Sequence, residues 1–167
     1  QALDETIDHQ FGKKGTVIES NKKAIAAGRA YAQANLGLVN FPWKIEARPG
    51  QNKGKILIDG NTAGAMGLVF GGCTFVSWYP ITPSSSLVES FIDLADKYRM
   101  KNGKRDFAVV QAEDELAAAG MIVGAGWAGA RAVTAISGPG FSLMAETAGL
   151  AYYAEIPTVI WDVQRVG

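Results

Sequence analysis

From Lys55 onward, short apolar runs alternate with longer segments of helical spacing, and this alternation constrains the fold more than any other feature of the sequence. The runs are rich in β-branched and aromatic residues: KILID, TFVSW, FAVVQ, AVTAIS and TVIWDV. The segments between them are TAGAMGLVFGG, SSLVESFIDLADKYRM, ELAAAGMIVGAGWAG and SLMAETAGLAYYA. Strands alternating with helices of this length indicate βαβ units. The sequence therefore predicts an α/β fold, with a parallel sheet, helices on both faces and right-handed crossovers.

The first fifty residues differ in composition from the rest. Residues 1–40 mix charged and small side chains, with helical spacing from about Asn21 to Leu36. Residues 41–54 carry two prolines, two glycines and several charges, which is typical of a linker. Because this stretch is short for a domain, we expect residues 1–40 to end an upstream domain and residues 55–167 to begin the sheet domain. The chain starts without methionine and stops after a strand-like run, so we expect a piece of a longer polypeptide, with its sheet domain incomplete at the C-terminus.

Composition argues against several classes of protein. The 16 basic and 16 acidic side chains cancel, whereas a nucleic-acid-binding surface is expected to be basic. No apolar run approaches the roughly 18 residues of a membrane span, and no signal-peptide pattern is present. Cys73, the single cysteine, excludes an internal disulfide and cannot build a metal site alone, so we predict no metal ligands here. His9, the single histidine, lies outside the sheet domain, which excludes a histidine-based triad within it. A reducing, cytoplasmic setting is the simplest interpretation.

Rigid or charged segments follow the last four predicted strands. They are YPITPSS, QAEDE, SGPG and the pair Gln164-Arg165. In open parallel sheets, ligands bind outside the carboxyl ends of the strands. A protein without a site there would scatter such segments between both ends of the sheet. The sequence therefore predicts a ligand site at the carboxyl edge.

The segment from Tyr79 to Pro83 is predicted to be a stiff, extended loop. Proline fixes its own φ angle and pushes the preceding residue toward extended geometry. A hairpin connection would use glycine or asparagine instead. We interpret the stiffness as preorganisation of a site, and we expect Ser84 to cap the helix that follows.

The acidic cluster from Glu113 to Glu115 has two interpretations. Carboxylates in a first helical turn complement the helix dipole, and Asp114 is a candidate cap. Glu115, however, precedes a helix with almost no polar residue, and a carboxylate at the head of a buried helix needs a partner. A ligand nitrogen would be such a partner. Structural and functional roles stay equally open on this spacing alone.

Three further features carry weaker signals. Ser137 to Gly140 is a glycine-rich turn whose amides could face an anion, although such turns are common. Arg165 is a surface cation by default, but its guanidinium group suits a carboxylate. Residues 60–67, GNTAGAMG, lack the G-x-G-x-x-G spacing, so we interpret them as close helix packing rather than a dinucleotide site.

In their order along the chain, YPITPSS, QAEDE, SGPGFSLMAE and DVQRVG resemble the alpha subunit of 2-oxoacid:ferredoxin oxidoreductases. The 2-oxoglutarate type, in which a gamma domain is fused upstream, is the most similar. The resemblance covers residues 55–167, and FGKKGTVIESNKKAIAAG looks like the end of a gamma domain. It implies a gamma tail at residues 1–40, a linker at 41–54, and then the first part of the domain that binds the pyrimidine of thiamine diphosphate.

The resemblance also implies roles for individual residues. Glu115 matches the catalytic glutamate that contacts the aminopyrimidine ring and stabilises its protonated nitrogen. Thr82 and Arg165 match residues that bind the carboxylate of the 2-oxoacid. The remaining matched residues shape that pocket or line the cofactor edge: Tyr79, Pro80, Ile81, Pro83, Ser137, Gly138, Pro139 and Gly140.

The activity that the resemblance implies is oxidative decarboxylation of a 2-oxoacid, 2-oxoglutarate first, to its acyl-coenzyme A with reduction of ferredoxin. Thiamine diphosphate would be shared with a beta subunit in a hetero-oligomer. The chain has neither a GDG motif nor a cysteine cluster, and in the family the magnesium ion and the 4Fe–4S cluster belong to that subunit. Alternatives are another split-domain thiamine-diphosphate enzyme, acting on pyruvate, branched-chain acids or indolepyruvate, and a non-catalytic assembly fragment. YPITP and QRVG count against a transketolase-like subunit.

Overall fold

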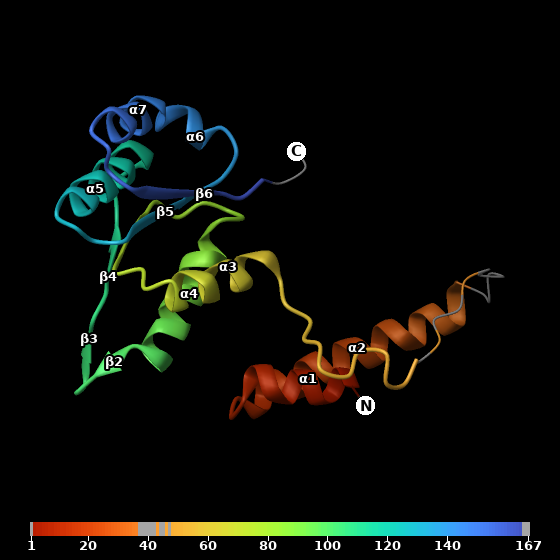
Figure 1. The fold of residues 1–167 in the computed structure, drawn as a ribbon. Coiled ribbons are helices and arrows are strands. Elements are labelled where there is room, and N and C mark those ends of the chain that lie inside the picture. The colour runs from red at the N-terminus through yellow and green to blue at the C-terminus, as the bar shows by residue number, and fades with distance from the viewer. Residues whose placement is uncertain (1, 37–42, 44–45, 47, 165–167) are drawn as a thin grey trace. The chain divides into compact units, whose positions relative to one another are not determined.

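The computed structural model describes residues 2–36, 43, 46 and 48–164, and it divides into two compact units. The helical unit, residues 1–53, contains α1 (Ala2–Phe11) and α2 (Gly15–Asn35) (Figure 1). An ion pair of 2.7 Å joins Lys22 of α2 to Asp8 of α1. No helix within the described ranges is both long and apolar enough to cross a membrane.

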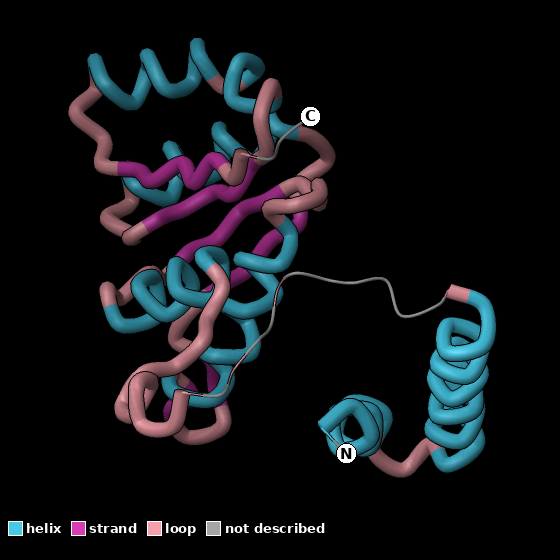
Figure 2. The backbone as a smooth tube through the Cα atoms, turned by 90° about the vertical axis from the view of Figure 1, so that its right-hand side faces the viewer, coloured by secondary structure: helices cyan, strands magenta, loops and turns pink. Residues whose placement is uncertain are grey.

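The sheet unit, residues 54–167, contains four parallel strands in the order β4-β1-β5-β6. Figure 2 shows its strands in magenta, with helices on both sides. The four strands are β1 (Phe75–Trp78), β4 (Ala108–Gln111), β5 (Ala132–Ile136) and β6 (Thr158–Asp162). Each neighbouring pair is parallel, and the last residues of β1 and β4 pair with each other, as do those of β5 and β6. The predicted α/β fold with a parallel sheet is confirmed.

Helices cover both faces of this sheet, as the sequence predicted. On one side lie α3 (Gly60–Phe70) and α4 (Ser85–Tyr98). On the other side lie α5 (Glu115–Trp127), α6 (Gly140–Leu143) and α7 (Ala145–Tyr153) (Figure 1). The sheet is therefore the middle layer of three.

The core beneath α3 and α4 is the larger of the two. Leu87 and Phe91 of α4 are fully buried there against Val76 of β1 and Val133 of β5. On the opposite face, Ile136 packs with side chains of α5 and of the α6–α7 segment. Burying each such side chain contributes about 1.5–3 kcal/mol, so packing on both faces fixes the strands.

Two expectations about individual elements are wrong. The run KILID, the first of five predicted strands, is not a strand, because residues 55–58 pair with no other strand. Its side chains lack the buried face that a strand needs: Ile56 is 75% exposed and Leu57 is 104% exposed. The last helical segment is not one helix but two, α6 and α7, which meet at Met144.

Two elements of the structure were not expected. The first is α1 in the helical unit. The second is an antiparallel hairpin of β2 (Met100–Lys101) and β3 (Lys104–Arg105). Its turn residues, Asn102 and Gly103, have φ angles of 52° and 73°. Asn-Gly with two positive φ angles is the preferred two-residue hairpin turn, so the sequence did carry a signal for this hairpin.

The interpretation of GNTAGAMG as a close-packing segment is confirmed at Gly64. A Cβ atom there would lie 2.8 Å from the ring of Trp161 in β6 and 3.3 Å from Leu87 in α4. Gly67, one turn further along α3, has open space around it. The absence of a side chain at Gly64 therefore allows α3 to approach β6 and α4 closely.

We expect Gly64→Ala to destabilise the intact protein by about 1–3 kcal/mol, because the added methyl group overpacks against Trp161. The matched control is Gly67→Ala in the same helix, which should be neutral or stabilise by up to about 1 kcal/mol. Urea unfolding monitored by Trp fluorescence measures both. Equal unfolding midpoints for the two variants would contradict this packing.

Candidate functional site

The predicted site segments follow three neighbouring strands and lie at the same edge of the sheet. Residues 79–84 follow β1, residues 112–115 follow β4, and residues 137–140 follow β5. In the register of the sheet, Trp78 pairs with Gln111, so the chain leaves β1 and β4 at the same level. The structure thus brings these segments together, while their individual roles stay predictions.

The loop from Tyr79 to Pro83 is closed by hydrogen bonds onto one carbonyl group. The backbone amides of Ser84 and Ser85 donate to the carbonyl oxygen of Ile81 at 2.8 Å and 3.1 Å. The hydroxyl group of Ser84 donates to the same oxygen at 2.9 Å. The Thr82–Pro83 peptide bond is cis. Ile81 itself packs against the buried cluster that contains Ile136, so the base of the loop is anchored in the core.

The expectation that Ser84 caps α4 with its side chain is wrong. Ser84 does precede the first helical residue, but its backbone is helical, with φ −77° and ψ −24°, rather than extended. A capping hydroxyl needs the extended conformation to reach the amides of the first turn. Here the hydroxyl group turns back to Ile81 and stiffens the loop instead.

Thr82 is exposed at the tip of this loop. Its hydroxyl group makes no hydrogen bond to any residue that the structure describes. Tyr79 and Pro80 are also exposed, whereas Pro83 is half-buried. A fixed loop therefore presents an unpaired hydroxyl group at the carboxyl edge, which is available to a ligand.

Asp114 caps α5, as predicted. Its backbone is extended, and its Oδ1 atom accepts a hydrogen bond of 2.7 Å from the backbone amide of Ala117. Glu115 is the next residue and the first of the helix. Its side chain is half-buried and has no hydrogen bond or ion pair with the described part of the chain. Within the acidic cluster, Asp114 is thus the residue that caps the helix, and the Glu115 carboxylate remains available to bind a ligand.

The Ser137–Gly140 turn lies against Glu115. Its backbone folds back on itself, because the amide of Gly140 donates to the carbonyl of Ser137 at 3.2 Å. Gly138 has a φ angle of +52°, which favours glycine. A Cβ atom at Gly140 would lie 2.5 Å from Ile136 and 3.5 Å from Cγ of Glu115. Glycine at position 140 therefore keeps the turn close to the head of α5.

Sequence reasoning missed two residues at this edge. Asp162, the last residue of β6, has a buried Oδ1 atom without a hydrogen-bond partner among the described residues, and its Oδ2 atom accepts from Nε2 of Gln164. Asn61 of α3 donates hydrogen bonds into the Tyr79–Pro83 loop and to α4. Asp162 could have been noticed as a charge that ends an apolar strand.

Arg165, one of the predicted site residues, lies outside the described residues.

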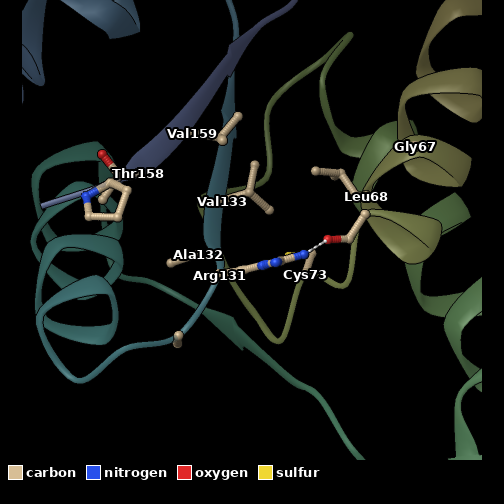
Figure 3. Close-up of a pocket in the computed structure, with 11 residues that line it drawn as sticks. Gly67, Leu68, Cys73, Arg131, Ala132, Val133, Thr158 and Val159 are labelled. Carbon is tan, nitrogen blue, oxygen red and sulfur yellow. Dashed lines mark hydrogen bonds between the residues drawn. The ribbon is translucent and has the colours of Figure 1, made fainter.

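A hollow of about 250 Å³ lies at the opposite, amino-terminal edge of the sheet (Figure 3). It is bounded by the end of α3 and the starts of β5 and β6. Arg131 donates a hydrogen bond to the carbonyl of Gly71 there, and burial raises the pKa of the Cys73 thiol, so this thiol is a weak nucleophile. None of the predicted site residues lines this hollow.

Across the described residues, no group of three or more His, Cys, Asp or Glu side chains lies close enough together to hold a metal ion.

A family profile described as pyruvate flavodoxin/ferredoxin oxidoreductase, thiamine-diphosphate-binding, matches residues 66–167. The chain belongs to this family. The match includes every predicted site residue, from Tyr79 to Arg165. The thiamine-diphosphate-binding fold that the sequence predicted is therefore confirmed.

Relatives within the family agree with the resemblance seen in the sequence. The alpha subunit of a 2-oxoacid:ferredoxin oxidoreductase from Saccharolobus solfataricus is 49% identical over 121 residues, which is 70% of this chain and 19% of that protein. The 2-oxoglutarate synthase subunit KorA of Archaeoglobus fulgidus is 44% identical over 111 residues, 66% of this chain and 30% of that protein. The chain is thus a homologue of 2-oxoacid:ferredoxin oxidoreductase alpha subunits.

A solved structure is similar to this chain. It is a 2-oxoglutarate:ferredoxin oxidoreductase from Magnetococcus marinus with 2-oxoglutarate, coenzyme A and succinyl-coenzyme A bound. It is 38% identical, with a TM-score of 0.69, over 99% of this chain and 27% of that one. The chain therefore spans about a fifth to a third of the length of the relatives it matches.

We expect Asp114→Ala to destabilise the intact protein by about 1 kcal/mol, because the Ala117 amide loses its partner. Asp114→Ser is the matched control and should cost only a few tenths of that, since serine caps about as well. The shift of the urea unfolding midpoint reports both. A loss as large for serine as for alanine would mean that the charge, and not the cap, matters.

Proposed function

We propose that this chain is part of the alpha component of a thiamine-diphosphate-dependent 2-oxoacid:ferredoxin oxidoreductase. The reaction decarboxylates a 2-oxoacid, transfers the acyl group to coenzyme A and passes electrons to ferredoxin. The observation that carries the proposal is the half-buried Glu115 carboxylate, which has no protein partner in the described chain and lies at the ligand edge of a thiamine-diphosphate-binding fold. Homology to alpha subunits supports it.

The residues at the carboxyl edge fit the aminopyrimidine half of the cofactor. In this proposal Glu115 is the catalytic residue, since its carboxylate would accept a hydrogen bond from the ring and stabilise positive charge on a ring nitrogen. The Ser137–Gly140 turn lines the same space, and the missing side chain at Gly140 keeps this turn against Glu115. When bound, thiamine diphosphate supplies the electron sink that decarboxylation requires.

Thr82 and Arg165 bind the carboxylate of the 2-oxoacid in this proposal. Thr82 donates its hydroxyl proton from a loop that is already closed onto the Ile81 carbonyl, so little ordering remains to be done when substrate binds. Arg165, three residues after the end of β6, contributes the opposite charge. Tyr79, Pro80, Ile81 and Pro83 give the pocket its shape.

A beta subunit completes the site. It supplies the magnesium ion that holds the diphosphate and the 4Fe–4S cluster that receives electrons, and the assembly is a cytoplasmic hetero-oligomer that reduces ferredoxin. Residues 1–40 are the tail of a gamma-type domain, and residues 41–54 link it to the pyrimidine-binding domain. Similarity over 99% of the chain to a 2-oxoglutarate:ferredoxin oxidoreductase supports this division, because it includes the first fifty residues.

2-Oxoglutarate is the substrate that we propose first. The KorA relative is a 2-oxoglutarate synthase subunit, and the similar solved structure holds 2-oxoglutarate and succinyl-coenzyme A. Pyruvate is the second candidate, because the family description names it. Ferredoxin reduction by the assembled complex, with each 2-oxoacid in turn, separates the two. A higher kcat/KM with pyruvate than with 2-oxoglutarate would overturn the first choice.

In the complex assembled with its beta subunit, we expect Glu115→Gln to lower kcat for ferredoxin reduction by at least about 100-fold, because the neutral amide no longer stabilises charge on the pyrimidine ring. Glu113→Gln, two residues away and exposed, is the control and should keep activity within about twofold. Size-exclusion chromatography checks assembly of both variants. Full activity of the Glu115 variant would exclude its catalytic role and would favour a purely structural fragment.

Thr82→Ala and Arg165→Ala should each raise KM for the 2-oxoacid by about tenfold or more, because each removes a hydrogen bond to a charged carboxylate. The KM for coenzyme A should stay within about twofold. Thr82→Ser, which keeps the hydroxyl group, should retain most of the affinity. If the variants change only KM for coenzyme A, the substrate assignment is wrong.

A further inference from the structure

Asn61 lies in the first turn of α3, but its side chain does not cap this helix. It is the second residue of α3, and the cap of this helix is Asp59, whose Oδ1 atom accepts from the amide of Thr62 at 2.9 Å. The hydrogen bonds from Thr62 lower the pKa of Asp59 from its ordinary value, because they favour the charged carboxylate. Asparagine is a poor helix former compared with alanine. The reason for Asn61 is therefore to be found outside α3.

Both N–H groups of the Asn61 side-chain amide donate hydrogen bonds to residues far away in the sequence. Nδ2 donates to the carbonyl oxygen of Pro83 at 2.9 Å and to the hydroxyl oxygen of Ser86 at 2.7 Å. The Ser86 hydroxyl group in turn donates to the Pro83 carbonyl at 3.3 Å. An amide has two donors, and here both are used. The three groups form a closed set of bonds between α3, the Tyr79–Pro83 loop and α4.

The carbonyl group of Pro83 is a second anchor point of the loop, after that of Ile81, and it accepts hydrogen bonds from Asn61 at 2.9 Å and from the Ser86 hydroxyl group at 3.3 Å. The Ile81 carbonyl fixes the inner half of the loop through the Ser84 and Ser85 amides. Pro83 directly follows Thr82, so a displacement of its carbonyl group moves the peptide that carries Thr82. Asn61 is half-buried, which limits competition from water for these bonds.

The helix that carries Asn61 is itself rigidly placed. Gly64 allows α3 to pack closely on Leu87 of α4, and the hydroxyl groups of Thr62 and Ser90 lie 3.3 Å apart across the two helices. Figure 1 shows α3 and α4 side by side below the sheet. A side chain on α3 can therefore act as a fixed support for the loop that precedes α4.

We propose that Asn61 is a positioning residue for substrate binding, and this rests on the proposed function. Its amide clamps Pro83 and Ser86, which keeps the Thr82 hydroxyl group aimed at the carboxylate of the 2-oxoacid. In this proposal Asn61 acts through the loop and through Ser86, and not by direct contact with substrate or cofactor. Loss of the clamp lets the tip of the loop move, and a displacement of about 1 Å at such a group is enough to weaken binding substantially.

The test variant is Asn61→Asp in the complete complex. Aspartate has nearly the same size, but it offers oxygen atoms where the Pro83 carbonyl needs a donor. Because a negative charge in the first turn suits the helix dipole, α3 itself should not be weakened. We expect KM for the 2-oxoacid to rise about tenfold and KM for coenzyme A to stay within about twofold. Ser86→Ala, which removes one of the two acceptors, should have a smaller effect in the same direction.

The control is Asn35→Asp, the same chemical change at an asparagine whose side-chain amide, within the described residues, bonds only to the Tyr31 carbonyl of its own helix. It should leave both KM values unchanged. Backbone hydrogen exchange of the Ser84 and Ser85 amides gives a readout that does not depend on turnover. These amides should exchange faster in Asn61→Asp, while the thermal unfolding midpoint stays within a few degrees of wild type.

Unchanged exchange of the two serine amides would overturn the clamp. Faster exchange without a rise in KM for the 2-oxoacid would overturn its link to substrate binding. A wild-type complex that turns over no 2-oxoacid would instead overturn the proposed function, and the exchange rates would still decide whether Asn61 holds the loop. These three failures are distinguishable because they appear in different measurements.

Discussion

The structure depends on β5, the strand in which all five residues are buried and which pairs in parallel with a neighbour on each side. Val133 and Ala135 face the core under α3 and α4, and Ile136 faces the cluster beside α5 and α6. A strand that is packed on two faces and paired on two edges cannot shift its register without exposing its apolar residues. The carboxyl ends of β1 and β5 are therefore fixed relative to each other, and residues 79–84 and 137–140 follow them at the same edge of the sheet.

Unpaired polar atoms remain at the carboxyl edge of the sheet. The Oδ1 atom of Asp162 is buried without a hydrogen-bond partner among the described residues, and Glu115 has no hydrogen bond or ion pair with them. Asp106 and Thr134 also have a buried oxygen atom without a hydrogen bond, although Oδ1 of Asp106 lies 3.0 Å from Nε of Arg99 in an ion pair. Buried polar groups in proteins are normally hydrogen-bonded. The carboxylates of Glu115 and Asp162 are therefore candidates to contact another molecule at the carboxyl edge.

Hydrophobic periodicity and capping residues predicted those parts of the fold that depend on residues close together in the sequence. Four strands, the helices between them and the Asp114 cap follow from periodicity and capping preferences. Residues 55–58 have strand propensity but no partner strand, and pairing is a tertiary property that propensity does not contain. The hydrogen bonds of the Ser84 and Asn61 side chains depend on carbonyl groups that the fold brings near them. Ser84 donates to the carbonyl of Ile81, and Asn61 donates to that of Pro83, 22 residues away. Spacing along the chain could not reveal these contacts.

The central claim is that this chain supplies the aminopyrimidine half of a thiamine-diphosphate site, with Glu115 at its centre. A structure of the complete complex with the cofactor bound tests this most directly. The account predicts a carboxylate oxygen of Glu115 at hydrogen-bonding distance, about 2.6–3.2 Å, from a nitrogen of the aminopyrimidine ring. A ring bound at the amino-terminal edge, or one separated from Glu115 by other side chains, would contradict it.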